Sequence, residues 1–122
     1  MTAFNFTNNI VGQVTYPIWS TGGSTSNCAY YNVPLASLNS CFTTYTFMDN
    51  AIVPPFAFGI AKWPAANYFP TSIGAVQFVN FNGGIGGDYH LLSGSPYKNA
   101  GSDGKDLGAD INAIQSMIAG AY

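Results

Sequence analysis

Charge is what this sequence has least of. Its 122 residues include only 3 Lys and 5 Asp, and neither Arg nor Glu occurs. Charged residues make up 7% of the chain, whereas about 25% is usual in soluble domains. So few cations cannot neutralise a run of phosphates, which excludes nucleic-acid binding. A surface wetted mainly by Asn, Ser, Thr, Gly and Tyr is typical of an extracellular β protein.

Long apolar runs are missing as well. None approaches the ~20 residues that a membrane-spanning helix needs, so we expect no membrane span. The first residues, 1–5, lack the charged region followed by an apolar one that marks a signal peptide. We therefore expect an extracellular or cell-surface protein whose signal peptide lies outside this chain, and a chain that is the C-terminal part of a longer protein.

Cysteine and histidine are scarce. Cys28 and Cys41 are the two cysteines and His90 is the single histidine. Two cysteines that close a short loop in a charge-poor chain favour a disulfide, worth ~3 kcal/mol in the chain-entropy description. Two buried free thiols are the alternative. Without a Cys-x-x-Cys pair, a zinc site is not expected.

What the sequence does contain is a recurring pair of an aromatic residue and asparagine. The pattern occurs as FTNNIV at 6–11, FMDNAIV at 47–53 and FVNFN at 78–82. The first two segments match if one residue is inserted before the Ile-Val pair. Asn9, Asn50 and Asn82 are unevenly spaced, but within the range of solenoid repeats. Stacked at successive bends they would form a hydrogen-bonded ladder. Chance is the alternative, because Asn and Phe are both abundant here.

Residue types and periodicity predict four strands and one helix. The strands are expected at 4–14, 41–53, 74–81 and 89–92, with loops at 20–27 and 54–70. The helix should start after Asp110, since apolar residues recur at helical spacing there and Gly120 lies near its end. These apolar residues are Ile111, Ile114, Met117 and Ile118. We expect this helix to fold under the last strand and cover its apolar end.

The closing segment, residues 88–110, carries a resemblance. Its order, DYHLLSGSP, then NAG, DG and DLGAD, resembles the end of secreted right-handed parallel β-helix proteins, the pectate-lyase-like superfold. The resemblance implies an all-β fold, a right-handed parallel β-helix (solenoid) of about three rungs with long loops and a short C-terminal capping helix. Residues 1–122 would form one domain, with rungs and loops at 1–87 and the terminal rung, a Gly/Asp loop and the capping helix at 88–122.

Carboxylates supply two weak candidate sites. Asp103, Asp106 and Asp110 lie among glycines, and calcium is bound by such oxygen-rich loops. Their spacing does not fit the EF-hand loop, however, and capping of turns and of the helix start is favoured. Asp49 and Asp88 are the weak catalytic candidates, because glycoside hydrolysis uses two carboxyl groups. Both are more easily explained as bend or turn residues.

Catalysis otherwise has little support in the sequence. The resemblance to polysaccharide lyases implies an Arg or Lys base, and Arg is absent, so the catalytic half of a lyase is not expected in this chain. His90 has no evident Ser or Cys partner for a nucleophilic triad. No cofactor other than a possible calcium ion is expected.

Aromatic residues of the expected loops are the candidate carbohydrate-binding residues. Trp19, Trp63, Tyr16 and Tyr68 either stack on sugar rings or pack the loops onto the strands. The sequence thus predicts a non-catalytic extracellular β-helix module that binds polysaccharide or acts as a scaffold. The alternative is a structural subunit that assembles with copies of itself through exposed β edges into an oligomer or filament. A fragment of a polysaccharide lyase or glycoside hydrolase is the third possibility.

Overall fold

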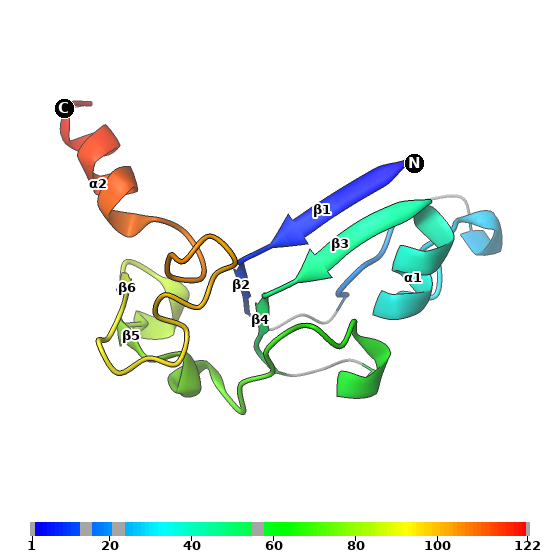
Figure 1. The fold of residues 1–122 in the computed structure, drawn as a ribbon, viewed down its shortest axis with the longest axis horizontal. Helices are drawn as coiled ribbons and strands as arrows, with labels where there is room; N and C mark the ends of the chain where they lie inside the picture. Colours follow the sequence, from blue (N-terminus) through cyan, green and yellow to red (C-terminus); the bar gives the residue numbers. More distant parts are fainter. Residues whose placement is uncertain (1, 13–15, 21–23, 55–57, 122) are drawn as a thin grey trace.

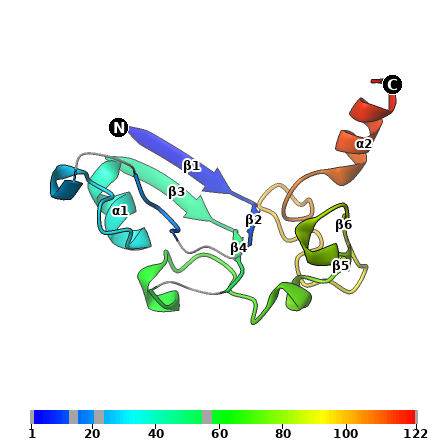
Figure 2. The same ribbon diagram turned by 180° about the vertical axis from the view of Figure 1, so that it is seen from behind.

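The computed structural model describes residues 2–12, 16–20, 24–54 and 58–121. The strands lie near the middle and at one end of the molecule, α1 packs at the other end, and α2 projects from the body (Figures 1 and 2). In chain order the strands and helices are β1 (Ala3–Thr7), β2 (Ile10–Val11), α1 (Pro34–Cys41), β3 (Thr44–Met48), β4 (Ala51–Ile52), β5 (Phe78–Asn80), β6 (Asp88–Leu91) and α2 (Ile111–Ala119). Short 3-10 turns occur at Ser24–Ser26, Ile60–Lys62, Ile73–Val76 and Asn82–Gly84.

Two parallel strand pairs share one register. β1 pairs with β3, and β2 pairs with β4. The chain bends between the two pairs at Asn8 and Asp49, whose φ angles are 63° and 55°. Asn and Asp adopt this left-handed conformation more readily than most residues. The register aligns Ile10 with Ala51 and Val11 with Ile52. The two segments therefore match without a gap, and the one-residue insertion expected from the sequence is wrong.

A third segment runs beside β4 without forming a strand of its own. Ala51 and Tyr68 form an isolated parallel bridge. The Ile52 N–H donates to the Tyr68 carbonyl at 2.9 Å, and the Tyr68 N–H donates to the Asn50 carbonyl at 2.8 Å. This bridge places Asn67 beside Asn50, which matters for the polar interior described below.

The last two strands turn back on each other. β5 and β6 are antiparallel, and the residues between them make a tight glycine-rich connection. Gly87 is required there, because a Cβ at this position would lie 2.2 Å from the carbonyl oxygen of Asn80. The connection places β6, the strand that contains Asp88 and His90, near the start of α2 (Figure 1).

Two apolar clusters form the core, and β4 contributes to both. Ile52 packs with Leu38 of α1, Phe47 of β3 and Trp63. Ala51 before it and Val53, which follows the strand, point the other way, as alternation along an extended chain requires. That second cluster consists of Ala51, Val53, Val76, Leu91, Tyr97 and Leu107.

The predicted disulfide is confirmed. Cys28 and Cys41 are bonded, with their Cα atoms 5.2 Å apart. The bond ties the last residue of α1 to the turns that precede it. The helix itself was not predicted, although Pro34 at its first turn is a known start signal.

The β-helix expectation is wrong. The described residues form three separate sheets of two strands each, two parallel and one antiparallel, together with two α-helices. In a solenoid each turn of chain adds a parallel strand to the one before. Here the third level is reduced to a single bridge at Tyr68, and the following strands pair antiparallel with each other. The described part of the chain is therefore a mixed α and β structure, and the all-β solenoid and its pectate-lyase-like resemblance do not hold.

The helix α2 begins and ends where predicted but does not cap the core. The Asp110 side chain accepts a hydrogen bond from the Ala113 N–H, and Gly120 follows the last turn. No residue of α2 is buried, and Met117 is 71% exposed. The expected cover over an apolar end is thus also wrong. Among the described residues, no helix combines the length and apolar character needed to cross a bilayer.

Candidate functional site

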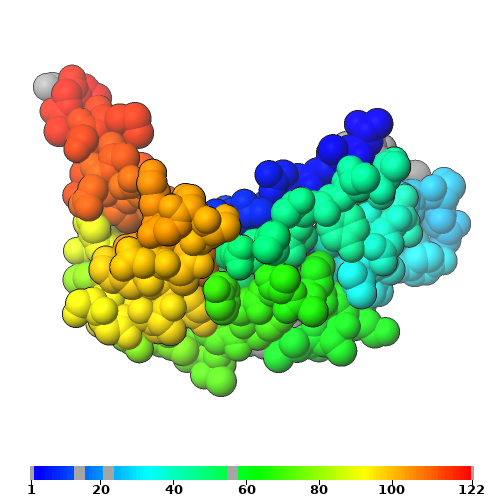
Figure 3. Space-filling view, viewed as in Figure 1, coloured from blue at the N-terminus to red at the C-terminus, as the bar shows by residue number. Residues whose placement is uncertain are grey.

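A cleft lies beside the first turn of α2, and this helix projects from the rest of the surface (Figure 3). Its volume is about 550 Å³. Its walls come from the bend at Asn8, from β6, and from the Gly/Asp-rich loop that leads into α2. The loop is attached to the bend, because the Gly108 N–H donates to the Asn8 carbonyl and the Ser102 N–H to Asn8 Oδ1.

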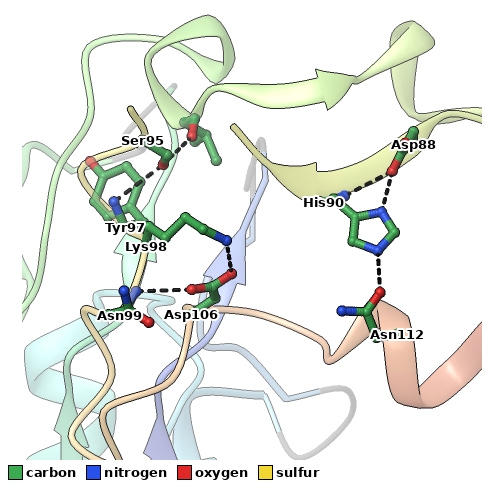
Figure 4. A network of polar contacts seen from close by, with 9 residues as sticks. Asp88, His90, Ser95, Tyr97, Lys98, Asn99, Asp106 and Asn112 are labelled. Carbon is green, nitrogen blue, oxygen red and sulfur yellow. Dashed lines mark hydrogen bonds and ion pairs between the residues drawn. The ribbon is translucent and has the colours of Figure 1, made fainter. Parts of the chain in front are cut away.

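His90 is clamped between two acceptors at this cleft. Its Nδ1 lies 2.5 Å from Oδ1 of Asp88, and its Nε2 lies 2.9 Å from Oδ1 of Asn112 in α2 (Figure 4). The hydrogen bond with Asp88, and next the one with Asn112, raise the pKa of His90. The side-chain hydrogen bond from His90, followed by its backbone N–H, lowers the pKa of Asp88.

This arrangement positions α2, because both ring nitrogens of His90 have a hydrogen-bond partner. The clamp joins β6 to the first turn of α2. Asp88, which was a catalytic candidate from the sequence, forms an ion pair with His90.

The three aspartates of the Gly/Asp-rich loop each accept from a backbone N–H. Asp103 accepts from Lys105 at 3.0 Å, and Asp110 accepts from Ala113 at 2.9 Å. Among the residues that the structure describes, no group of three metal-ligating side chains gathers. Calcium binding by this loop stays a prediction, and the present role of these carboxylates is to hold turns and the helix start.

Asp106 has a second partner besides the backbone. Its Oδ1 accepts from the Asn99 N–H at 2.9 Å, and its Oδ2 pairs with Lys98 Nζ at 3.0 Å (Figure 4). The backbone hydrogen bond, and then Lys98, lower its pKa. The same segment is anchored by Ser95, whose hydroxyl donates to the Val76 carbonyl at 2.8 Å.

Asp49, the other catalytic candidate, lies at a bend away from the cleft's walls. Its positive φ and the bond from its N–H to the Ala66 carbonyl account for its place in the chain. The structure gives Asp49 and Asp88 separate partners and supplies no feature that links them in one site.

Two of the three asparagines of the sequence pattern meet, and the third is replaced by another. Oδ1 of the buried Asn50 accepts from N and Nδ2 of Asn9, at 3.0 and 2.9 Å. Oδ1 of Asn67 accepts from N and Nδ2 of Asn50, both at 3.0 Å. Asn82 lies elsewhere and donates to the Ile85 carbonyl at 2.6 Å. Sequence reasoning missed Asn67, which follows alanines and carries no aromatic–Asn signature.

Aromatic rings gather on the surface beside the disulfide-linked turns. We call Tyr16, Trp19, Tyr30 and Tyr31 the aromatic surface. Tyr16 and Trp19 are 68% and 47% exposed and stack on each other, with ring centroids 5.2 Å apart. The indole N–H of Trp19 donates to the Tyr30 carbonyl at 2.9 Å, and Tyr30 meets Tyr31 edge-on.

The other two aromatic candidates have structural partners. Trp63 is only 4% exposed and packs in the cluster around Phe47, so its ring faces are not available to a ligand. Tyr68 is partly exposed and meets the ring of Tyr97 edge-on at 5.6 Å. Of the four rings proposed from the sequence, Tyr16 and Trp19 alone form a shared exposed surface.

Comparisons with known proteins add no relative. No family model, no curated protein and no solved structure matches this chain. The resemblance to pectate-lyase-like proteins therefore has no support from a matching family either.

Proposed function

We propose that this chain is a non-catalytic binding module and that its aromatic surface binds carbohydrate. The observation that supports the proposal is the stacked pair of Tyr16 and Trp19, held at the surface with large exposed ring areas. A sugar ring presents an apolar face of C–H groups, which packs well against an aromatic face. The two stacked rings form such a platform.

The platform is held in place before any ligand arrives. The Trp19 indole is fixed by its bond to the Tyr30 carbonyl. The adjoining turns are tied by the Cys28–Cys41 bond. Fixing side chains in advance reduces the conformational entropy that binding must otherwise remove. The disulfide also supports an extracellular location, since such bonds persist in oxidising compartments.

Charge favours an uncharged polysaccharide as the ligand. Residues 1–48 contain no Asp, Glu, Lys, Arg or His, so the aromatic surface is drawn entirely from neutral sequence. Hydroxyl and amide groups lie beside it, among them Ser20, which donates to the side chain of Asn27. A neutral sugar needs rings and neutral hydrogen-bonding groups, whereas an acidic polymer needs cations, which this part of the chain lacks.

The test is affinity electrophoresis of the purified chain in gels that contain neutral or acidic polysaccharides. We expect retardation by at least one neutral polymer. Trp19→Ala should weaken it about three- to tenfold, the value of one lost ring stack. Phe58→Ala, which removes an exposed ring from a distant part of the chain, is the matched control and should bind normally.

Two results would contradict the proposal. One is the absence of retardation by any polymer in the panel. The other is equal binding by the wild-type chain and Trp19→Ala, with folding of both confirmed by circular dichroism. Retardation by acidic polymers alone would contradict the preference for neutral sugars.

A further inference from the structure

One edge of β1 is open. β1 pairs with β3 on one side, and no other described strand pairs with β1. The Thr44 N–H donates to the Thr2 carbonyl at 3.2 Å. Because backbone groups alternate along a parallel ladder, those of Ala3, Asn5 and Thr7 then face the open side. β1 has neither proline nor charge, the usual means of blocking an edge.

The asparagine stack ends at this open edge with an acceptor. Oδ1 of Asn67 accepts two hydrogen bonds from Asn50, and Oδ1 of Asn50 accepts two from Asn9. Asn9 is the last asparagine of the stack, at the end next to the open edge of β1. None of the described residues donates a hydrogen bond to its Oδ1. Donors that repeat the pattern would have to come from a strand on the far side of β1.

The amide protons show the same interruption. Asn50 Nδ2 donates across to the Phe6 carbonyl of β1, and Asn67 Nδ2 donates across to the Phe47 carbonyl of β3. Asn9 Nδ2 has no such acceptor on a neighbouring strand among the described residues and donates to the Thr7 carbonyl of its own strand at 2.9 Å, as Asn67 Nδ2 also does to the Pro64 carbonyl of its own segment. The across-strand acceptor that the two lower asparagines use is thus missing for Asn9.

We propose that the open edge of β1 binds an extended strand of another polypeptide, by addition to the sheet. The partner strand runs parallel to β1 and places an asparagine level with Asn9, so that its N–H and Nδ2 donate to Asn9 Oδ1. An aromatic residue three positions earlier lies over Phe6, as Phe6 lies over Phe47 with ring centroids 5.2 Å apart. This inference stands independently of carbohydrate binding.

A second copy of this chain does not supply that strand. Two β1 edges related by a two-fold axis would run antiparallel. That arrangement separates the two Asn9 residues and leaves both acceptors without a donor. The chain's two Phe-x-x-Asn segments, at Phe6–Asn9 and Phe47–Asn50, are already used in β1–β4. The partner is therefore a strand that carries its own Phe-x-x-Asn segment.

The probe for this site is a fluorescein-labelled peptide with the sequence of residues 44–53, which contains the required pattern. Fluorescence anisotropy with the full chain should show saturable binding. Asn5→Pro removes one outward N–H without removing a β1–β3 hydrogen bond, and should weaken binding at least about tenfold. Asn5→Ala keeps that N–H and should bind the peptide normally. The peptide carrying Asn50→Ala should bind about tenfold more weakly.

The inference is overturned if the peptide does not bind, if Asn5→Pro binds it as well as Asn5→Ala, or if the peptide carrying Asn50→Ala binds normally. Urea unfolding of both Asn5 variants checks that β1 remains in place. Sedimentation of the chain without peptide measures whether it associates with itself. Self-association that Asn5→Pro abolishes would show that a second copy occupies the edge, and would also overturn the inference.

Discussion

Oδ1 of Asn50 accepts both the backbone N–H and the side-chain N–H of Asn9. Asn50 is at the same time a double donor to Asn67, and it is fully buried. A buried amide with all of its capacity used joins three segments of the chain. Such a side chain is worth more than an average hydrogen bond, because its loss leaves several buried groups unpaired.

Replacing Asn50 should therefore destabilise the protein strongly. Asn50→Ala leaves the Asn9 N–H and the Phe6 carbonyl without their side-chain partner. We expect the free energy of unfolding to fall by at least about 3 kcal/mol, from the cost of unpaired buried groups. Urea unfolding followed by tryptophan fluorescence measures it. The exposed Asn5→Ala is the control and should change stability by no more than about 0.5 kcal/mol.

The attachment of α2 should depend on pH. The pKa of His90 is raised and that of Asp88 is lowered by their mutual hydrogen bond. The His90 contribution is present at acid pH and is lost as the pH rises past its raised pKa. The Asp88 contribution is lost as the pH falls through its lowered pKa. The helix is held best between these limits, in mildly acidic solution.

An NMR titration of the His90 ring measures this directly. The pKa should lie above the value of about 6.5 usual for histidine. Asn112→Ala should lower it partly, because Asp88 is the larger cause of the shift. Hydrogen exchange of the α2 amides should accelerate once His90 loses its proton. A pKa at or below the usual value would show that the clamp does not form.

Reduction of the disulfide should loosen the turns that carry the aromatic surface. Cys28 and Cys41 are separated by 13 positions, which predicts a loss of ~3 kcal/mol for the open chain. Unfolding of the double variant Cys28→Ser, Cys41→Ser, compared with the oxidised protein, measures it. Equal stability of the two would mean that the loop is held by its packing alone.

The exposure of α2 predicts that its apolar face contributes little to folding. Met117→Lys should leave the free energy of unfolding within about 0.5 kcal/mol of the wild-type value. Leu38→Ala, in the buried cluster of α1, should cost about 2–5 kcal/mol. If Met117→Lys were as costly as Leu38→Ala, α2 would have to cover the core, as its amphipathic sequence first indicated.

Features set by nearby residues could be predicted from the sequence. Asp110 caps α2 because its carboxylate reaches an N–H three residues later, and this depends on local chain geometry only. The Cys28–Cys41 bond closes a short loop between the two cysteines of the chain. The strand segments around Phe6 and Phe47 follow from their β-branched and aromatic composition.

Pairing between distant segments could not be predicted in the same way. Asn82 fits the sequence pattern better than Asn67, but long-range packing decides which asparagine lies beside Asn50. Residues 78–91 do carry a local hairpin signal, the Asn82-Gly83 pair between two strand segments, but the expectation of stacked parallel strands did not use it, and β5 and β6 pair antiparallel. The fate of Trp63 was open because a loop ring is buried or exposed according to what the rest of the chain packs over it.

The alternation along β4 has a consequence for how the molecule comes apart. Ala51 and Val53 belong to one apolar cluster, and Ile52, between them, belongs to the other. A strand that forms a wall of both clusters cannot leave one without opening the other. The two clusters, although the strands around them form separate sheets, should unfold in a single step. A substitution that destabilises the packing near β6 should therefore also destabilise the packing around α1.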